Sequence, residues 1–319
     1  MILSVRRKWM PSLRFEYDPK KSPDAIPPTA GQIVAAFGRH YLVETAHGST
    51  LSCVMRGKKG GAACGDRVLI QPTTTGQGVI ESILPRSSLL YRSDAYREKL
   101  IAANVTQIII VVAAVPSFSE ELVNRCLAAA ESQRIKALIV LNKSDLAEPT
   151  RSAAATLLLY RELGYPLLQI SAKTDVTSML PHLQGHLSVL VGQSGMGKST
   201  LINALIPEAE RATAEISVAL DTGRHTTTHA RLYEIDPDTR LIDSPGMQEF
   251  GLHHINGADL AWGFVEFHPY LGQCRFSNCH HTGEPGCALD SASKTGEINP
   301  RRLVFYRKLI SSLGAALRK

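Results

Sequence analysis

The stretch from residue 187 to residue 205 constrains the fold of this chain more than any other part of its sequence. An apolar run, Leu187 to Val191, is followed by a glycine-rich loop and by a second run that begins at Thr200. The loop fits the pattern G-x-x-x-x-G-K-[ST] and consists of Gly192, Gln193, Ser194, Gly195, Met196, Gly197, Lys198 and Ser199. A buried parallel strand, a phosphate loop and a helix follow one another in this way in P-loop proteins. The stretch therefore predicts an α/β domain, whereas a chance glycine-rich turn would not have both fitting flanks.

The predicted loop has the groups needed to hold a nucleotide and its magnesium ion. Glycines let backbone N–H groups curl around phosphates, and the helix N-terminus faces the same anion. We expect Lys198 to reach the β- and γ-phosphates, and the Ser199 hydroxyl is suited to Mg²⁺. Thr200 opens the helical run and belongs to the same predicted site.

Two further motifs indicate that the base is guanine. Each follows an apolar run typical of a strand, and the motifs are Asn142-Lys143-Ser144-Asp145 and Ser171-Ala172-Lys173. The Asp145 carboxylate can accept from both N1–H and N2–H₂ of guanine, whereas adenine would leave the charge unpaired. The first motif alone is a common loop cap, but the two motifs together with the phosphate loop predict binding of GTP and GDP.

A fourth motif, Asp243-Ser244-Pro245-Gly246, ends the apolar pair Leu241-Ile242. Segments of the form D-x-x-G hold Mg²⁺ through a water bound to the aspartate, here Asp243, and contact the γ-phosphate through the glycine N–H, here Gly246. The next residue is Met247 instead of a water-orienting glutamine, and Gln248 is one position away. Another group is therefore expected to position the attacking water.

The segment from Thr222 to His229 lies where switch I belongs, between the phosphate loop and the fourth motif. It offers threonine hydroxyls for Mg²⁺ and two histidines, His225 and His229. An exposed loop histidine is by default a solvated residue. His225 is the candidate catalytic residue because it precedes the threonine run and the glutamine is missing.

The order of the motifs is itself informative. An ordinary GTPase has the phosphate loop first and the guanine motifs last, whereas here the guanine motifs precede the loop. The sequence therefore predicts a circularly permuted GTPase. The permutation moves the end of the nucleotide domain close behind the switch segments, where an attached domain can respond to the nucleotide state.

A second group of chemically active residues lies near the end of the chain. The pattern is Cys274-x4-Cys279-x-His281-x5-Cys287, within a stretch rich in glycine and proline. Three thiolates and one imidazole complete a tetrahedral Zn²⁺ site with no open position, which is typical of a structural site. A disulfide within the cluster is the alternative. The spacing alone also leaves His280 as a competing imidazole.

Composition and charge limit the class of protein. The chain has 319 residues, of which 44% are hydrophobic and 20% charged, and its formal net charge is +6. The basic excess gathers in residues 1–21 and in the last helical run, which favours polyanionic partners. No run of 18 apolar residues and no signal-peptide pattern is present. We expect a soluble, cytoplasmic protein with no membrane segment.

Four parts are predicted along the chain. Residues 1–30 are expected to form a basic flexible arm and residues 31–88 an OB-fold barrel for RNA, because five short alternating runs are separated by turns. The barrel could instead only pack on its neighbour, since Arg56, Lys58, Lys59 and Arg67 could form a solvated face. Residues 89–256 are the predicted GTPase domain.

Residues 257–319 are the predicted zinc-binding and C-terminal helical domain. Its last helix spaces apolar residues on one face as a docking stripe, namely Leu303, Tyr306, Ile310, Leu313 and Leu317. Within the GTPase domain, Ser117-x-x-Glu120 predicts a capping box for a helix that buries Leu122 and Cys126.

With these features in place, residues 31–319 closely resemble the RsgA or YjeQ family of small-subunit-dependent GTPases. The resemblance implies action on the small (30S) ribosomal subunit late in its assembly, contact with 16S-type rRNA, and GTP hydrolysis stimulated by the subunit. It also implies one Zn²⁺ at Cys274, Cys279, His281 and Cys287, and a role for His225 in place of the missing glutamine. A monomer is expected.

The residues themselves leave two other functions open. One is a non-catalytic RNA-binding module whose affinity is switched by GTP. The other is a GTPase that acts on a different RNA or protein. If the chain is a GTPase, its intrinsic hydrolysis is expected to be slow, because the usual water-positioning residue is absent. An RNA surface could then order the switch.

Overall fold

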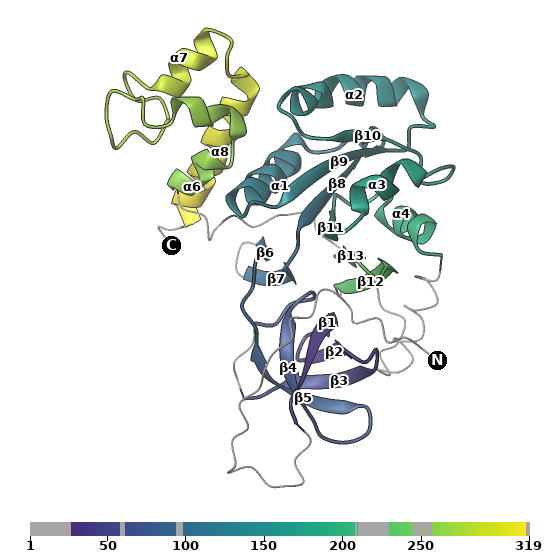
Figure 1. The fold of residues 1–319 in the computed structure, drawn as a ribbon. Helices are drawn as coiled ribbons and strands as arrows, with labels where there is room; N and C mark the ends of the chain where they lie inside the picture. Colours follow the sequence, from purple (N-terminus) through teal and green to yellow (C-terminus); the bar gives the residue numbers. More distant parts are fainter. Residues whose placement is uncertain are drawn as a thin grey trace.

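The computed structural model describes residues 27–57, 61–93, 98–207, 209, 230–244, 252 and 257–316 (Figure 1). A barrel, a layered α/β unit and a C-terminal helical part follow one another along the chain. Within the described residues, no helix combines the length and apolar character that crossing a bilayer requires.

The first part is a closed five-stranded barrel. Its strands are β1 (Thr29–Phe37), β2 (His40–Thr45), β3 (Thr50–Met55), β4 (Arg67–Pro72) and β5 (Gln77–Ile83). They pair in the order β1-β2-β3-β5-β4, and β4 returns to β1, which closes the barrel. The β3–β5 pair is parallel and the other pairs are antiparallel. All five predicted runs form strands, and the closure is that of an OB-fold.

Alternation of side chains gives the barrel its own core. Its fully or nearly buried members are Ile33, Tyr41, Val43, Cys53, Val68, Ile70 and Ile80. Gly31 is required by this packing, because a Cβ there would lie 2.6 Å from the Val43 side chain and 2.8 Å from that of Ile70. Lys58, Lys59 and the predicted basic arm up to residue 26 lie outside the described residues.

The α/β unit is built on six strands in the order β10-β9-β8-β11-β13-β12. They are β8 (Gln107–Ala113), β9 (Lys136–Asn142), β10 (Leu167–Gln169), β11 (Leu187–Val191), β12 (Arg231–Asp236) and β13 (Thr239–Asp243). Five of them run parallel, and β12 is antiparallel to β13. The predicted parallel sheet is confirmed.

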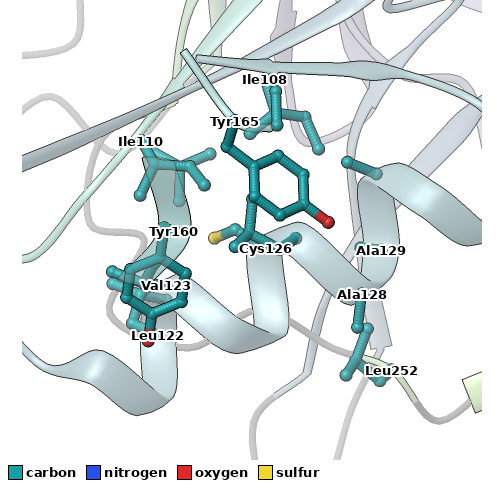
Figure 2. Close-up of a cluster of buried hydrophobic side chains, with 14 of the residues drawn as sticks. Ile108, Ile110, Leu122, Val123, Cys126, Ala128, Ala129, Tyr160, Tyr165 and Leu252 are labelled. Carbon is teal, nitrogen blue, oxygen red and sulfur yellow. The ribbon is translucent and has the colours of Figure 1, made fainter. Parts of the chain in front are cut away.

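Helices cover both faces of this sheet (Figure 1). Successive residues of β8 point to opposite faces. Ile108 and Ile110 pack with α1 (Glu120–Ser132) and α2 (Ala147–Glu162), as Figure 2 shows for α1. Ile109 and Val111 pack on the other face with α3 (Leu180–Leu183), which follows the 3-10 turn η1 (Thr177–Met179), and with α4 (Lys198–Leu205). The near-continuous apolar strands result from this double coverage.

The barrel and the sheet of the α/β unit are joined by a strand pair. Residue Ala35 of β1 pairs with Arg231 of β12, so the two sheets form one hydrogen-bonded array. The Arg240 guanidinium on β13 is 5% exposed, donates to the Gln32 side chain of β1 and forms ion pairs with Glu44 and Glu234. The junction is therefore a polar network built around a buried arginine.

The C-terminal part docks on α1. It contains α6 (Gly257–Trp262), the 3-10 helix η2 (Val265–Tyr270), α7 (Ala288–Lys294) and α8 (Pro300–Ala316). The predicted stripe is buried at Leu303, Tyr306 and Leu313, and Ile310 packs against the same core, whereas Leu317 lies outside the described residues. A charged residue, Arg302, is fully buried at this contact.

Two local features differ from the sequence expectation. A hairpin of β6 (Leu89–Ser93) and β7 (Glu98–Ala103) lies between the barrel and β8 and was not predicted. The α1 cap was assigned to the wrong serine: the Ser119 side chain accepts from the Leu122 N–H at 3.3 Å, and the helix begins at Glu120. Ser119 immediately precedes the acidic first turn, so its oxygen is the one within reach of an unpaired N–H.

Candidate nucleotide site and candidate metal centre

The predicted nucleotide motifs come together at the carboxyl edge of the parallel sheet. Asn142 ends β9, Ser171 follows β10, Gly192 follows β11 and Asp243 ends β13. Open α/β sheets bind ligands in the crevice outside this edge. Segments far apart in the sequence therefore meet in one place because their strands are parallel and adjacent.

Asn142 is the link between three of the motifs. Its side chain is 1% exposed, its Nδ2 donates to the Met196 carbonyl at 2.9 Å, and its Oδ1 accepts from the Ala172 N–H at 3.0 Å. Gly197 is forced to be glycine, because its φ is +89° and a Cβ would lie 2.4 Å from the Asn142 Nδ2. The guanine motif, the Ser171 segment and the phosphate loop are thus held together by hydrogen bonds within the protein.

Lys143 joins the guanine motif to the phosphate loop and to the loop that follows β8. Its Nζ donates to the Gly195 carbonyl at 2.6 Å and to the Val115 carbonyl at 2.8 Å. Gln193 of the phosphate loop accepts from the Ser119 N–H at 2.6 Å, which ties the loop to the start of α1. These bonds preset the shape of the phosphate loop.

The predicted base reader is positioned by a hydroxyl. The buried Ser171 donates to the exposed Asp145 carboxylate at 2.7 Å. This hydrogen bond, aided by the nearby charges of Lys173 and Lys143, lowers the pKa of Asp145 below its ordinary value. An ionised carboxylate that keeps accepting capacity toward solvent is what a guanine edge requires.

Lys198 and Asp243, at the predicted phosphate end of the site, are both partly buried and influence each other's pKa. Lys198 donates to the carbonyls of Gly192 at 2.6 Å and Gln193 at 2.9 Å. Burial lowers the pKa of Lys198, and the charge of Asp243 opposes that shift. Burial likewise raises the pKa of Asp243, opposed by Lys198. Each charge is thus less favourable here than in water.

Other predicted site residues are exposed or undescribed. Ser194, Ser199, Thr200 and Lys173 are exposed, with their side chains open to a ligand. His225 and Gly246 lie outside the described residues, as do Met247 and the rest of the predicted switch I. Their roles stay predictions.

The second site is a cluster of Cys274, Cys279, His281 and Cys287, whose ligand atoms all lie within 4.8 Å of one another. The His281 Nδ1 lies 3.4, 3.7 and 3.5 Å from the three Sγ atoms in that order. Tetrahedral zinc bonds of about 2.0–2.3 Å would put these atoms about 3.6 Å apart. The donor set and spacing therefore fit a metal ion, and all six cysteines of the chain are free thiols.

The loop around the cluster is organised by Glu284. Its carboxylate accepts from the N–H groups of His280 at 3.0 Å, Thr282 at 2.7 Å and Gly283 at 3.1 Å. These bonds lower its pKa to about 2 against the opposing effect of desolvation. The left-handed φ of +61° at His281 turns this imidazole inward, while His280 remains exposed.

Helix α8 anchors the loop to the rest of the chain. The Tyr306 hydroxyl donates to the His280 carbonyl at 2.9 Å, and the Arg307 Nε donates to the His281 carbonyl at 3.0 Å. Sequence reasoning missed Glu284 and these α8 contacts. Nothing in the spacing marks them, because they bind backbone groups of a loop whose path the sequence does not specify.

Comparison with known proteins gives a consistent result. A model of the RsgA GTPase family matches residues 83–253. The small ribosomal subunit biogenesis GTPase RsgA of Nitrosospira multiformis is 66% identical over 90% of this chain and 92% of its own length. The protein of the same name from Neisseria meningitidis serogroup B is 52% identical over 92% and 96%.

Two solved structures are similar over nearly their whole length. YjeQ from Thermotoga maritima matches with a TM-score of 0.69 and 31% identity, covering 90% of this chain and 99% of that one. YloQ, described as a circularly permuted GTPase, matches with a TM-score of 0.67 and 27% identity, covering 94% and 99%. The predicted family resemblance and the predicted permutation are both confirmed.

Proposed function

This chain belongs to the RsgA GTPase family and is a GTP hydrolase, and from that premise we propose that it binds the small (30S) ribosomal subunit during late assembly and hydrolyses GTP to GDP and phosphate there. The joining of base and phosphate motifs through Asn142 carries the proposal, because turnover needs both ends of GTP held at once. The relatives are named small ribosomal subunit biogenesis GTPases, which supports the small subunit as the partner.

We assign the parts of the reaction to this chain's residues as follows. Asp145 accepts from the guanine edge, with Ser171 as its support. Lys198 exchanges its loop carbonyls for the β- and γ-phosphates. Ser199 and Asp243 are the residues that would hold Mg²⁺, and the ion would supply positive charge to offset the negative charge of the phosphates. The Gly246 N–H meets the γ-phosphate.

We infer that the barrel contacts 16S-type rRNA and responds to the nucleotide state. Its β1 strand pairs with β12, which begins two residues after the segment expected to contain switch I. The contact between Gln32 and Arg240 adds a second link to β13, the strand that ends at Asp243. If phosphates dominate the contact, affinity for the subunit falls steeply with salt.

We infer further that one Zn²⁺ binds the Cys274, Cys279, His281 and Cys287 cluster as a structural ion. Four protein ligands leave no open position for substrate. Burial lowers the pKa of His281, which keeps the ring neutral and able to ligate. Elemental analysis of freshly purified protein tests this, and one zinc per chain is the expected result. We also propose a monomer that works in the cytoplasm.

GTP turnover with and without purified small subunits tests the function. A rate that rises on adding subunits supports the proposal. Subunit binding that depends on GTP without any rise in rate would favour the RNA-binding module. Turnover that ignores the subunit would favour another RNA or protein as the partner.

His225 is our candidate for positioning the attacking water. His225→Ala is expected to keep GTP and subunit binding but to lose about 10²-fold or more of the stimulated rate. His229→Ala is the matched control in the same segment and should change the rate much less. Wild-type hydrolysis by the His225 variant on the subunit would assign the water to Gln248 or to the ribosome.

A further inference from the structure

A cavity of about 370 Å³ lies where the barrel meets the GTPase sheet. Its wall includes Gln32 and Arg67 from the barrel, and Thr106, His186, Asp238 and Arg240 from the GTPase part. Thr106 and His186 precede β8 and β11, whereas the phosphate loop follows β11. The cavity therefore lies at the amino edge of the parallel sheet, opposite the nucleotide site.

The cavity wall contains a charged donor that lacks an acceptor. The Arg67 Nε is buried and has no hydrogen-bond partner among the described residues. The neighbouring carboxylate of Asp66 is engaged by Arg86 through two bonds of 2.7 Å. A buried guanidinium N–H without an acceptor keeps its full desolvation penalty, which an acceptor entering the cavity would remove.

Thr106 offers a second donor by elimination. The Lys136 ammonium can only donate, and it lies 3.4 Å from the His186 Nε2, so the ring hydrogen is assigned to Nδ1. That Nδ1 lies 3.0 Å from the Thr106 Oγ1, which also accepts from the Leu187 N–H at 3.0 Å. The hydroxyl hydrogen is left with the Leu187 carbonyl at 3.4 Å, a long contact that a ligand can replace.

The two arginines of the wall differ in their partners: among the described residues Arg67 forms no ion pair, whereas Arg240 lies between two carboxylates. Arg240 is paired with Glu44 at 3.6 Å and Glu234 at 3.1 Å. Asp238 is the carboxylate in the wall, and it is exposed. Available donors and a recessed guanidinium are the features of an oxyanion site, and arginine is well suited to phosphate.

We propose that this cavity binds a phosphate group, with Arg67 and Thr106 as donors. Its volume falls within the range of small-ligand pockets. Because the wall combines β1 and β4 of the barrel with β13, a bound phosphate contacts both sides of the junction. The site does not depend on the function proposed above.

Binding is measured by calorimetry on the full chain saturated with GDP and Mg²⁺, so that the phosphate loop is filled. The probes are inorganic phosphate, pyrophosphate and a short single-stranded RNA. Arg67→Gln is expected to weaken binding at least about tenfold, and Thr106→Val about three- to tenfold. Arg56→Gln is the matched control, since that barrel arginine is 67% exposed and pairs with Glu81.

The probes separate the sources of the phosphate. Arg67-dependent binding of phosphate or pyrophosphate identifies a small ligand, and Arg67-dependent binding of RNA alone identifies the nucleic-acid backbone. The proposal is overturned if no probe binds the GDP-loaded chain, or if Arg67→Gln binds as the wild type does. GDP affinity reports whether each variant folds. If Arg67→Gln does not fold, phosphate binding by Thr106→Val tests the proposal instead, and binding equal to that of the wild type overturns it.

Discussion

The nucleotide site and the cysteine–histidine cluster are built in opposite ways. The nucleotide site gathers loops from four strand ends, and its motifs are joined by protein hydrogen bonds such as those of Asn142. The cluster draws its four ligands from one loop between Cys274 and Cys287. The nucleotide site is positioned by the surrounding fold, whereas we expect the loop of the cluster to depend on its own four ligands.

The difference extends to the charges. At the nucleotide site, burial disfavours the charged forms of Lys198 and Asp243, yet each is partly offset by the other. In the cluster, burial raises the pKa of Cys279 to about 12, and the neighbouring thiols add to this shift. Only a cation can stabilise three thiolates so close together. We therefore expect the cluster to need a bound cation, as proposed above, and the nucleotide site to keep its shape through its own hydrogen bonds.

Removing the metal should have the largest effect of all. Structural zinc contributes about 10–16 kcal/mol in small zinc-finger peptides. Chelation or His281→Ala should therefore disorder the loop from about 274 to 287, while GDP binding persists. Hydrogen exchange of the loop and GDP affinity, measured on the same sample, provide the check.

His280→Ala is the matched control for the metal prediction. Its imidazole is exposed and lies outside the cluster, so zinc content and loop protection should stay unchanged. A loop that remains protected after zinc is removed would show that Glu284 and the α8 contacts suffice to hold it.

Arg302 sharpens the comparison, because it joins the part that contains the cysteine–histidine cluster to the GTPase part. Its guanidinium forms two bonds to Glu266, at 2.6 and 3.2 Å, donates to Asn124 of α1, and stacks 4.4 Å from the Phe264 ring. Arg302→Met leaves the buried Glu266 carboxylate unpaired and should destabilise the chain by about 3–5 kcal/mol. Urea unfolding measures this loss.

Arg301→Met is the neighbouring control. That residue is 48% exposed and pairs with Glu120 at 3.4 Å. Exposed pairs contribute about 0–1 kcal/mol, so its loss should be small. Equal effects of the two variants would mean that Arg302 is as well solvated as its neighbour.

These arginines also show where sequence reasoning ends. The motifs at 142, 171, 192 and 243 were predictable because each follows an apolar run, and parallel strands bring their ends together. Adjacent arginines in a helix, by contrast, give no sign that one is buried and the other exposed. The partners that decide this, Glu266 and Asn124, are distant in sequence.

The sequence also could not decide whether His280 or His281 is the ligand. Both histidines satisfy the ligand count, and family resemblance alone favoured the second. The backbone φ at His281 and the hydrogen bonds that the Glu284 carboxylate accepts from the loop determine which ring faces the thiols. Loop path is set by such hydrogen bonds, which residue spacing does not encode.

Base selection should change by a smaller amount. Asp145→Asn replaces a double acceptor with an amide that suits xanthine, so preference for GTP over XTP should fall by about a hundredfold or more. Competition binding with both nucleotides measures the ratio. Ser171→Ala removes just the supporting hydrogen bond and should weaken GTP binding by less. Unchanged selectivity in the Asn variant would remove Asp145 from the base site.

The smallest predicted effect tests whether burying the charge of Asp243 at the nucleotide site destabilises the protein. Because burial raises the pKa of Asp243, its ionised form is less favourable in the fold than in the unfolded chain. The penalty is present above the raised pKa and is relieved as pH falls through it. Asp243→Asn should therefore stabilise the nucleotide-free protein at neutral pH by about 1 kcal/mol, and weaken Mg²⁺-dependent GTP binding.

The stabilisation of Asp243→Asn should shrink as the pH is lowered toward the ordinary value of 3.8, because the wild-type carboxyl then becomes neutral as well. Asp236→Asn, in the same hairpin, is the control of opposite sign, because a hydrogen bond from Thr239 lowers the pKa of Asp236. That variant should lose stability at neutral pH, and its deficit should vanish as the pH falls below the ordinary value. Melting temperatures across this range decide the matter. If both variants lose stability at neutral pH, the attraction of Lys198 outweighs burial, and the buried charge of Asp243 does not destabilise the protein.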